Sequence, residues 1–423
     1  SLSNLSESFS VSLLHPHQVS NFTTFLFCPS AKLTTLDLSD NALTNSIPAS
    51  FGHFASLQEL TLSSNSLTGP LPASMGSVST LTSMLITDNQ LSGQIPGTFN
   101  LLMNLQQLEL YHNALTGTIP DLSELQQLQT LNLEFNDIRG TIPSTLGTLN
   151  QLQILFLNHN SLRGTIPDAL YSLTQLTELY LGNNLLTGTI PEFNGRLGQL
   201  LYFDVQGNHL QGSIPASVNS LTLCQSFNVE SNYLTGTIPD ALCTLQHATY
   251  VNVNNNLLNG TIPSNLHNLT SATDIYFGVN LLTGTIPATV GQLPSIRLLE
   301  MTFNSLTGHI PDSFGALGTL LYAELNNNQL SGHIPESVGN LSSCLGLALS
   351  VNHLSGTIID VIGSLTQLRV LAIDKATAIF EKPRAIALDN EALRILQLAG
   401  VRDGEFETVA IPEVQYRSPL FGR

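Results

Sequence analysis

Acidic and aromatic residues recur in this sequence at fixed distances before a series of evenly spaced asparagines. These repeat asparagines stand at positions 41, 65, 89, 113, 136, 160, 184, 208, 232, 256, 280, 304, 328 and 352. Our candidate ligand-binding residues lie two, four or six positions before them: Glu109, Tyr111, Phe156, Glu178, Tyr180, Tyr202, Asp204, Tyr276, Glu300, Tyr322 and Glu324. Carboxylates beside aromatic rings are typical of surfaces that bind proteins, peptides or carbohydrates.

The same carboxylates are weaker candidates for catalysis or metal binding. Glu300 and Glu324 occupy one position on neighbouring repeats, as a pair of acid–base residues would. However, acids recur along the whole series without a Ser–His or Cys–His set, which favours a solvated acidic surface. The acids also lack the spaced ligand loop of a calcium site, and His309 with His333 supplies only two metal ligands. We therefore predict a non-enzymatic protein with no catalytic residue, metal or cofactor.

A second periodic feature is a ladder of hydroxyl residues five positions after the repeat asparagines. Its members are Thr118, Thr141, Thr165, Thr189, Ser213, Thr237, Thr261 and Thr285. Regular hydroxyl rows on a flat solenoid face resemble ice-binding surfaces, although strand faces favour hydroxyl ladders in any case. Ice binding is therefore an alternative function.

The residues around each repeat asparagine predict the elements that position these side chains. The repeat asparagines are 24 residues apart, except for one interval of 23 between positions 113 and 136. Apolar residues eight, five and three positions before them, as in Leu33, Leu36 and Leu38, predict a short strand. Glycine follows four positions after them in thirteen copies, with Asn45 as the exception. An Ile-Pro step then stops the strand, and apolar residues three apart predict an irregular or 3₁₀ turn.

The pattern LxxLxLxxNxLxGxIPxxLxxLxx resembles the plant-type leucine-rich repeat of receptor-kinase ectodomains and polygalacturonase-inhibiting proteins. The resemblance implies an α/β-class solenoid, mostly β, with irregular or 3₁₀ convex turns. It also implies a parallel concave sheet and a superhelical arc of about 14 regular repeats plus caps. The paired-cysteine, Trp-containing amino cap of the land-plant proteins is missing, and the chain has no tryptophan.

The repeat divides the chain into three parts. We expect an amino-terminal cap at 1–32, a leucine-rich-repeat array at 33–368, and degenerate repeats with a carboxy-terminal cap and tail at 369–423. Residues 1–368 hold 22 acidic and 5 basic residues, whereas residues 369–423 hold 8 of each. The array therefore carries the formal charge of −17, which argues against nucleic acid as a partner.

Several features suit a secreted or cell-surface protein. Candidate glycosylation sites are Asn4, Asn21, Asn259, Asn268 and Asn340. No apolar run reaches the roughly 18 residues of a transmembrane helix. Cys224 and Cys243 lie on successive coils, so the sequence leaves open whether a disulfide joins them.

These observations predict a recognition module that binds a protein, peptide or glycan on its acidic and aromatic concave face. The alternative is a structural subunit of a larger extracellular or membrane-associated assembly. A membrane-associated assembly would lie on the lumenal side of the membrane. The tail at 411–423 is a candidate docking segment for such an assembly partner.

Overall fold

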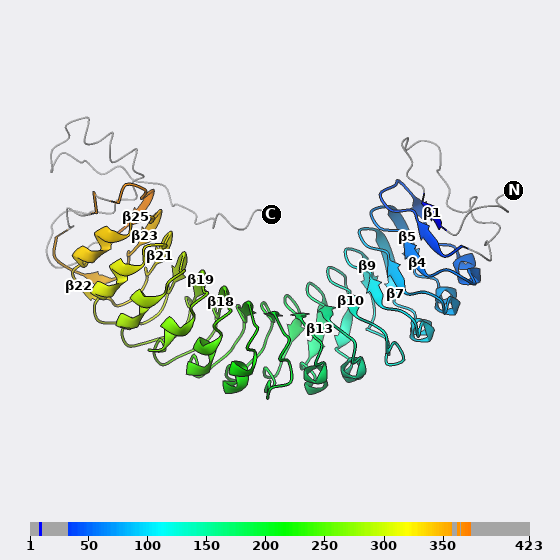
Figure 1. Cartoon of the computed structure of the whole chain (residues 1–423), viewed down its shortest axis with the longest axis horizontal. Helices are drawn as coiled ribbons and strands as arrows, with labels where there is room; N and C mark the ends of the chain where they lie inside the picture. Colours follow the sequence, from blue (N-terminus) through cyan, green and yellow to red (C-terminus); the bar gives the residue numbers. More distant parts are fainter. Residues whose placement is uncertain (1–7, 11–32, 358–361, 364, 374–423) are drawn as a thin grey trace.

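The computed structural model describes residues 8–10, 33–357, 362–363 and 365–373. They form a curved solenoid in which every coil places a strand on the concave side and a turn or short helix on the convex side (Figure 1). The predicted mostly β solenoid is therefore confirmed.

The concave face is one parallel sheet of 16 strands. In spatial order they are β1 (Ser8–Ser10), β2 (Thr35–Asp37), β4 (Glu59–Thr61), β6 (Ser83–Leu85), β8 (Gln107–Glu109), β10 (Thr130–Asn132), β12 (Ile154–Phe156), β14 (Glu178–Tyr180), β16 (Tyr202–Asp204), β17 (Ser226–Asn228), β18 (Tyr250–Asn252), β19 (Asp274–Tyr276), β20 (Leu298–Glu300), β21 (Tyr322–Glu324), β23 (Gly346–Ala348) and β25 (Val370–Ala372). The sheet crosses the predicted boundary at 368, because β25 pairs with β23. Most of the predicted amino cap, and the chain from 374 onward, lie outside the described residues.

Shorter parallel ladders follow the repeat asparagines on a lateral face. They consist of β3 (Thr44–Asn45), β5 (Ser66–Pro70), β7 (Gln90–Gln94) and β9 (Ala114–Thr116); β11 (Arg139–Thr141), β13 (Ser161–Gly164) and β15 (Leu185–Leu186); and β22 (Ser331–Gly332) with β24 (His353–Leu354).

Short 3₁₀ helices form most of the convex face. They are η2 (Ala49–His53), η3 (Ala73–Ser77), η4 (Gly97–Leu101), η5 (Ser144–Thr148), η6 (Asp168–Ser172), η7 (Ala216–Ser220), η8 (Asp240–Thr244), η9 (Leu266–Asn268), η10 (Ala288–Gln292), η11 (Asp312–Ala316) and η12 (Glu336–Asn340). A proline directly precedes each five-residue helix, as Pro167 precedes η6 with φ −67°. Its fixed φ ends the preceding extended segment and starts the turn.

The coil with 23 residues loses its residue on the convex side. After Pro120, turns replace the 3₁₀ helix, while Thr130 of β10 still pairs with Gln107 of β8. The concave sheet therefore keeps its register through the deletion.

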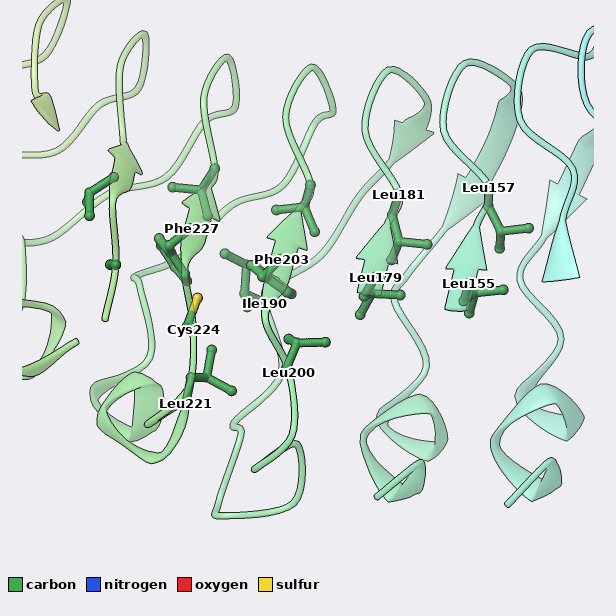
Figure 2. Close-up of a cluster of buried hydrophobic side chains, with 14 of the residues drawn as sticks. Leu155, Leu157, Leu179, Leu181, Ile190, Leu200, Phe203, Leu221, Cys224 and Phe227 are labelled. Carbon is green, nitrogen blue, oxygen red and sulfur yellow. The ribbon is translucent and has the colours of Figure 1, made fainter. Parts of the chain in front are cut away.

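Stacked apolar side chains fill the space between the two faces (Figure 2). Leu155 and Leu179 are neighbours at equivalent positions of adjacent strands. Phe203 and Phe227 also occupy equivalent positions of adjacent coils, and their ring centroids are 5.4 Å apart. Cys224 takes a leucine position and is fully buried. The structure answers the open question of a disulfide between Cys224 and Cys243. Cys224 precedes β17, Cys243 lies in η8 on the convex side, and both are free thiols.

The repeat asparagines are buried or half-buried hydrogen-bonding centres. The side-chain Nδ2 of Asn256 donates to the carbonyls of Val229, Val253 and Asn254 at 3.0, 3.2 and 3.0 Å, and its Oδ1 accepts from the backbone N–H of Leu234 at 3.0 Å. These partners lie on its own coil and on the preceding one. The same asparagine bonds recur from Asn65 to Asn352.

The glycines that follow the repeat asparagines are required for two reasons. Gly188 has φ +80°, a left-handed conformation that costs any side chain energy, and Asn45 occupies the same conformation in the one coil without the glycine. A Cβ on Gly188 would also lie 2.7 Å from Cγ2 of Thr165 on the preceding coil. The hydroxyl ladder therefore has an architectural role, since each threonine methyl fills the space that the next glycine leaves.

We expect Asn256→Asp to lower the free energy of unfolding by at least about 3 kcal/mol, because a carboxylate cannot donate to three buried carbonyls. Asn255→Asp is the matched control: Asn255 is exposed, and its φ of +52° suits aspartate. Urea denaturation followed by circular dichroism measures both variants. Similar losses of stability in the two variants would contradict the structural role of the repeat asparagine.

Gly188→Ala should cost about 2 kcal/mol of stability, from the left-handed backbone and from contact with the Thr165 methyl. Adding Thr165→Ser, which removes the methyl, should restore part of the loss in a double-mutant cycle. Gly198→Ala serves as the control, because nothing lies within 4 Å of a Cβ there. Additive effects of the Gly188 and Thr165 changes would show that the predicted packing is absent.

Candidate functional site

The candidate ligand-binding residues share one face because strand residues alternate. In β14, Leu179 points into the core and is fully buried, whereas Glu178 and Tyr180 on either side are half-buried on the concave face. The same alternation places all eleven candidates on this face. It brings them together in three groups rather than in one site.

The amino-terminal group contains Glu109 and Tyr111, at and just after β8. Burial raises the pKa of Glu109, and the neighbouring Glu134 carboxylate raises it further. Tyr111 packs edge-on against His112, with ring centroids 5.5 Å apart. Nδ1 of His112 lies 2.8 Å from Oδ1 of Asp88. This contact is an ion pair only when the imidazole of His112 is protonated.

The central group is a continuous aromatic patch on β12, β14 and β16. Phe156 packs edge-on against Tyr180, with ring centroids 4.8 Å apart, and Tyr180 stacks on Tyr202 at 6.5 Å. Glu178 and Asp204 border the patch, because Glu178 pairs with Tyr202 and Tyr180 pairs with Asp204 across the sheet. Three rings and two carboxylates are thus held by neighbouring strands.

The environment of the central group disfavours negative charge. Oδ1 of Asp204 accepts from the backbone N–H of Gln206 and Oδ2 from Nδ2 of Asn228, both at 2.9 Å. Burial outweighs these bonds and raises the pKa of Asp204 to about 6. Burial likewise raises the pKa of Tyr180 to about 12, helped by nearby Glu178 and Asp204. A cationic or hydrogen-donating ligand would relieve this cost.

The structure adds polar residues between the central and carboxy-terminal groups. Asn252 donates from Nδ2 to Oε2 of Glu230 and to the hydroxyl of Tyr250, both at 2.8 Å. Asn228 reaches Asp204 in the same way. We did not select these residues from the sequence, although Tyr250 and Glu230 lie in the same columns as the candidates.

The carboxy-terminal group contains Tyr276, Glu300, Tyr322 and Glu324 on β19, β20 and β21. Tyr276, Glu300 and Glu324 are cross-strand neighbours in one row. Glu300 differs from the solvent-exposed carboxylate that the sequence suggested, since only 6% of it is exposed. Its carboxylate lies over Gly278, where a Cβ would leave no room, and it accepts from Asn254 two coils away.

Other predicted positions fall elsewhere. The hydroxyl ladder lies exposed on the lateral face. Thr187, two residues before Thr189 of this ladder, donates from Oγ1 to the carbonyl of Gly164 at 3.3 Å. Asn259 and Asn340 are exposed and Asn268 is half-buried, while Asn4 and Asn21 lie outside the described residues.

Two further features are absent from the described residues. None of their helices is long and apolar enough to cross a membrane. No three His, Cys, Asp or Glu side chains of this part of the chain come together as a metal site.

Comparisons with known proteins agree with this architecture. A family model described as leucine rich repeat matches residues 24–67, 79–138 and 126–186, and a second leucine-rich-repeat model matches residues 295–317 and 319–341. A comparison with curated protein sequences finds no match.

Solved structures of receptors are similar over most of the chain. A TDR receptor aligns with a TM-score of 0.78 and 29% identity, over 81% of this chain and 59% of that one. The plant peptide hormone receptor RGFR1 in complex with RGF2 gives 0.66 and 31%, over 81% and 64%. The Arabidopsis receptor kinase HAESA ectodomain with an extended IDA peptide hormone gives 0.57 and 30%, over 82% and 67%. This chain thus spans less than two thirds of the first two structures.

Stability should rise as the pH falls from about 7.5 to about 5. The pKa values of Glu109, Glu178, Asp204, Glu230 and Glu324 are all raised in the folded chain. Folded molecules therefore bind protons before unfolded ones do, so the gain begins near pH 6 for Asp204 and is complete below its unfolded pKa of about 4.

The denaturation midpoint at each pH checks this prediction. Asp204→Asn keeps an acceptor for the Gln206 N–H. It should reduce the gain in the free energy of unfolding between pH 7.5 and pH 5 by about 1–2 kcal/mol. A midpoint that stays constant or falls on acidification would contradict the buried-carboxylate interpretation.

Proposed function

Because this chain belongs to the leucine-rich-repeat family, we propose that it is a non-enzymatic recognition protein that binds a protein or peptide on its concave face. The observation that carries the proposal is the aromatic patch of Phe156, Tyr180 and Tyr202 with its bordering carboxylates. Such rings supply large contact areas at little conformational cost, which is why they dominate binding energy in interfaces.

The charge of the concave face favours a cationic partner over a neutral one. The positions one, two, four and six before the repeat asparagines hold no lysine or arginine. They hold twelve carboxylates: Asp37, Asp40, Glu59, Asp88, Glu109, Glu134, Glu178, Asp204, Glu230, Asp274, Glu300 and Glu324. A basic protein or peptide would be attracted to this face and oriented on it.

The structural relatives support a peptide ligand and an extracellular setting. RGFR1 and HAESA are receptors solved with the peptide hormones RGF2 and IDA. We propose a secreted or cell-surface location on this likeness. Rigid stacked coils would hold the binding residues in place, so association would require little reorganisation.

Replacing Tyr180, Tyr202 and Tyr276 together by alanine should weaken partner binding at least about 100-fold, since each central aromatic contributes at least about 1–2 kcal/mol. The measurement is capture from the native source by immobilised wild-type and variant chains, followed by titration of the partner identified. Tyr233→Ala is the control, because Tyr233 is 50% exposed but lies outside the candidate columns. Unchanged melting temperatures would show that folding is intact. Equal capture by the triple variant would exclude the concave-face site.

A further inference from the structure

A compact polar quartet lies at the carboxy-terminal end of the concave face. It consists of Glu300 and Thr302 on one coil and Glu324 and Asn326 on the next. Glu300 and Glu324 are paired across β20 and β21, and Thr302 and Asn326 follow each of them by two residues. Since side chains alternate, all four face the concave side, and the core residues Met301 and Leu325 lie between them.

The two carboxylates of the quartet have different surroundings. Glu300 is held by hydrogen bonds: Oε1 accepts from the backbone N–H of Thr302 at 3.0 Å and from its hydroxyl, and Oε2 accepts from Asn254. The Glu324 carboxylate has no hydrogen-bond donor among the described residues, and burial and the Glu300 charge raise its pKa. A like charge on the adjacent strand and no counter-ion leave Glu324 electrostatically unsatisfied.

Asn326 adds a side-chain amide, without a partner among the described residues, beside the Glu324 carboxylate. Only 8% of it is exposed, and its side chain has no hydrogen-bond partner in the described part of the chain. Asn326 is not among the described residues whose unpaired side-chain atoms are wholly buried, so its amide still borders solvent and a ligand can reach it. Its carbonyl oxygen and the Glu324 carboxylate lie on the same face of the same coil, and both can accept hydrogen bonds.

An apolar rim borders the quartet. Val279 and Phe303 directly precede repeat asparagines on neighbouring coils and are 43% and 55% exposed. Their φ values of +48° and +50° are unfavourable for a β-branched and an aromatic residue. The backbone N–H of Phe303 donates to the carbonyl of Asn326 at 3.2 Å, which places the rim beside the quartet. Phe135 and Val351 share this repeat position, conformation and exposure. Val279 and Phe303 are therefore singled out by their place beside the quartet, where they offer a contact surface to an apolar ligand group.

We propose that the quartet binds the positively charged end of a lysine or arginine side chain in a peptide, while the Val279–Phe303 rim contacts a neighbouring apolar side chain. Glu324 and Asn326 would accept hydrogen bonds from the bound cation, and Glu300 would add negative charge. This inference rests on the proposed peptide-binding function and specifies one part of its ligand.

An organic cation suits the quartet better than calcium does. Calcium takes six to eight oxygen ligands. Both Glu300 oxygens already accept hydrogen bonds, which leaves too few free oxygens in the quartet for such a shell. A guanidinium or ammonium group needs only two or three acceptors and forms charge-assisted bonds with them.

The test compares two tripeptide probes, acetyl-Leu-Arg-Trp-amide and the same peptide with neutral citrulline in place of arginine. The chain has no tryptophan, so probe fluorescence reports the peptide alone. At low ionic strength the full chain should bind the arginine probe roughly tenfold more tightly, as a partly desolvated charge pair allows. Glu324→Gln should reduce this preference to less than about threefold, because its charge supplies most of the difference.

Matched variants keep the result interpretable. Glu59→Gln makes the same change on β4 at the other end of the sheet and should leave the preference unchanged. Asn326→Leu removes the amide oxygen at similar volume and should also lower the preference, which provides a second test if Glu324→Gln does not fold. Thermal melting of each variant establishes folding.

Three outcomes would overturn the inference. Equal binding of both probes by the wild type, or no binding of either, would exclude this basic–apolar subsite. A preference that survives both Glu324→Gln and Asn326→Leu would place the cation elsewhere. A melting shift produced by calcium alone and lost in Glu324→Gln would assign the quartet to a metal. Replacing only Tyr180 and Tyr202 tests the wider concave-face proposal without altering the quartet, because β17, β18 and β19 separate their strands from β20. The two proposals can therefore fail separately.

Discussion

The structure depends on the buried side-chain amide of the repeat asparagine. Each coil must reverse direction after its concave strand, and the turn leaves backbone carbonyls and N–H groups inside the protein. One asparagine donates to three carbonyls and accepts from one N–H, as Asn256 does across two coils. No other side chain of this size offers both functions without charge. The strict spacing of these asparagines follows from that requirement.

This arrangement leaves the concave positions free to vary. Core contacts and turn bonds are supplied by the residues at fixed repeat positions, so a residue such as Tyr180 contributes little that a coil needs to form. Adjacent parallel strands also bring these free side chains within about 5 Å of their neighbours. Carboxylates placed there lose solvent and repel one another, which raises the pKa of Glu324. A positive charge near them would lower this electrostatic cost.

The repeat predicts much of the structure because its signals are local and redundant. Leucine spacing, the asparagine, the glycine and the proline each indicate the same coil, and they place all eleven candidate residues on the concave face. Other features depend on contacts between coils. Glu300 is buried because Gly278 on the preceding coil leaves space for its carboxylate and Asn254 on the coil before that donates to it. The hydroxyl ladder is another example, because its role depends on the contact of each threonine methyl, such as that of Thr165, with a glycine of the next coil, such as Gly188.

Departures from the repeat are therefore the more informative positions. The site before each asparagine adopts a left-handed backbone, and in several coils it holds residues that suit this conformation, such as Asn183 and Asn255. Phe135, Val279, Phe303 and Val351 do not suit it, and each exposes an apolar side chain to water. Neither backbone preference nor core packing accounts for them. Val279 and Phe303 lie beside Asn326 and Glu324, and this position is the reason for including them in the proposed peptide subsite.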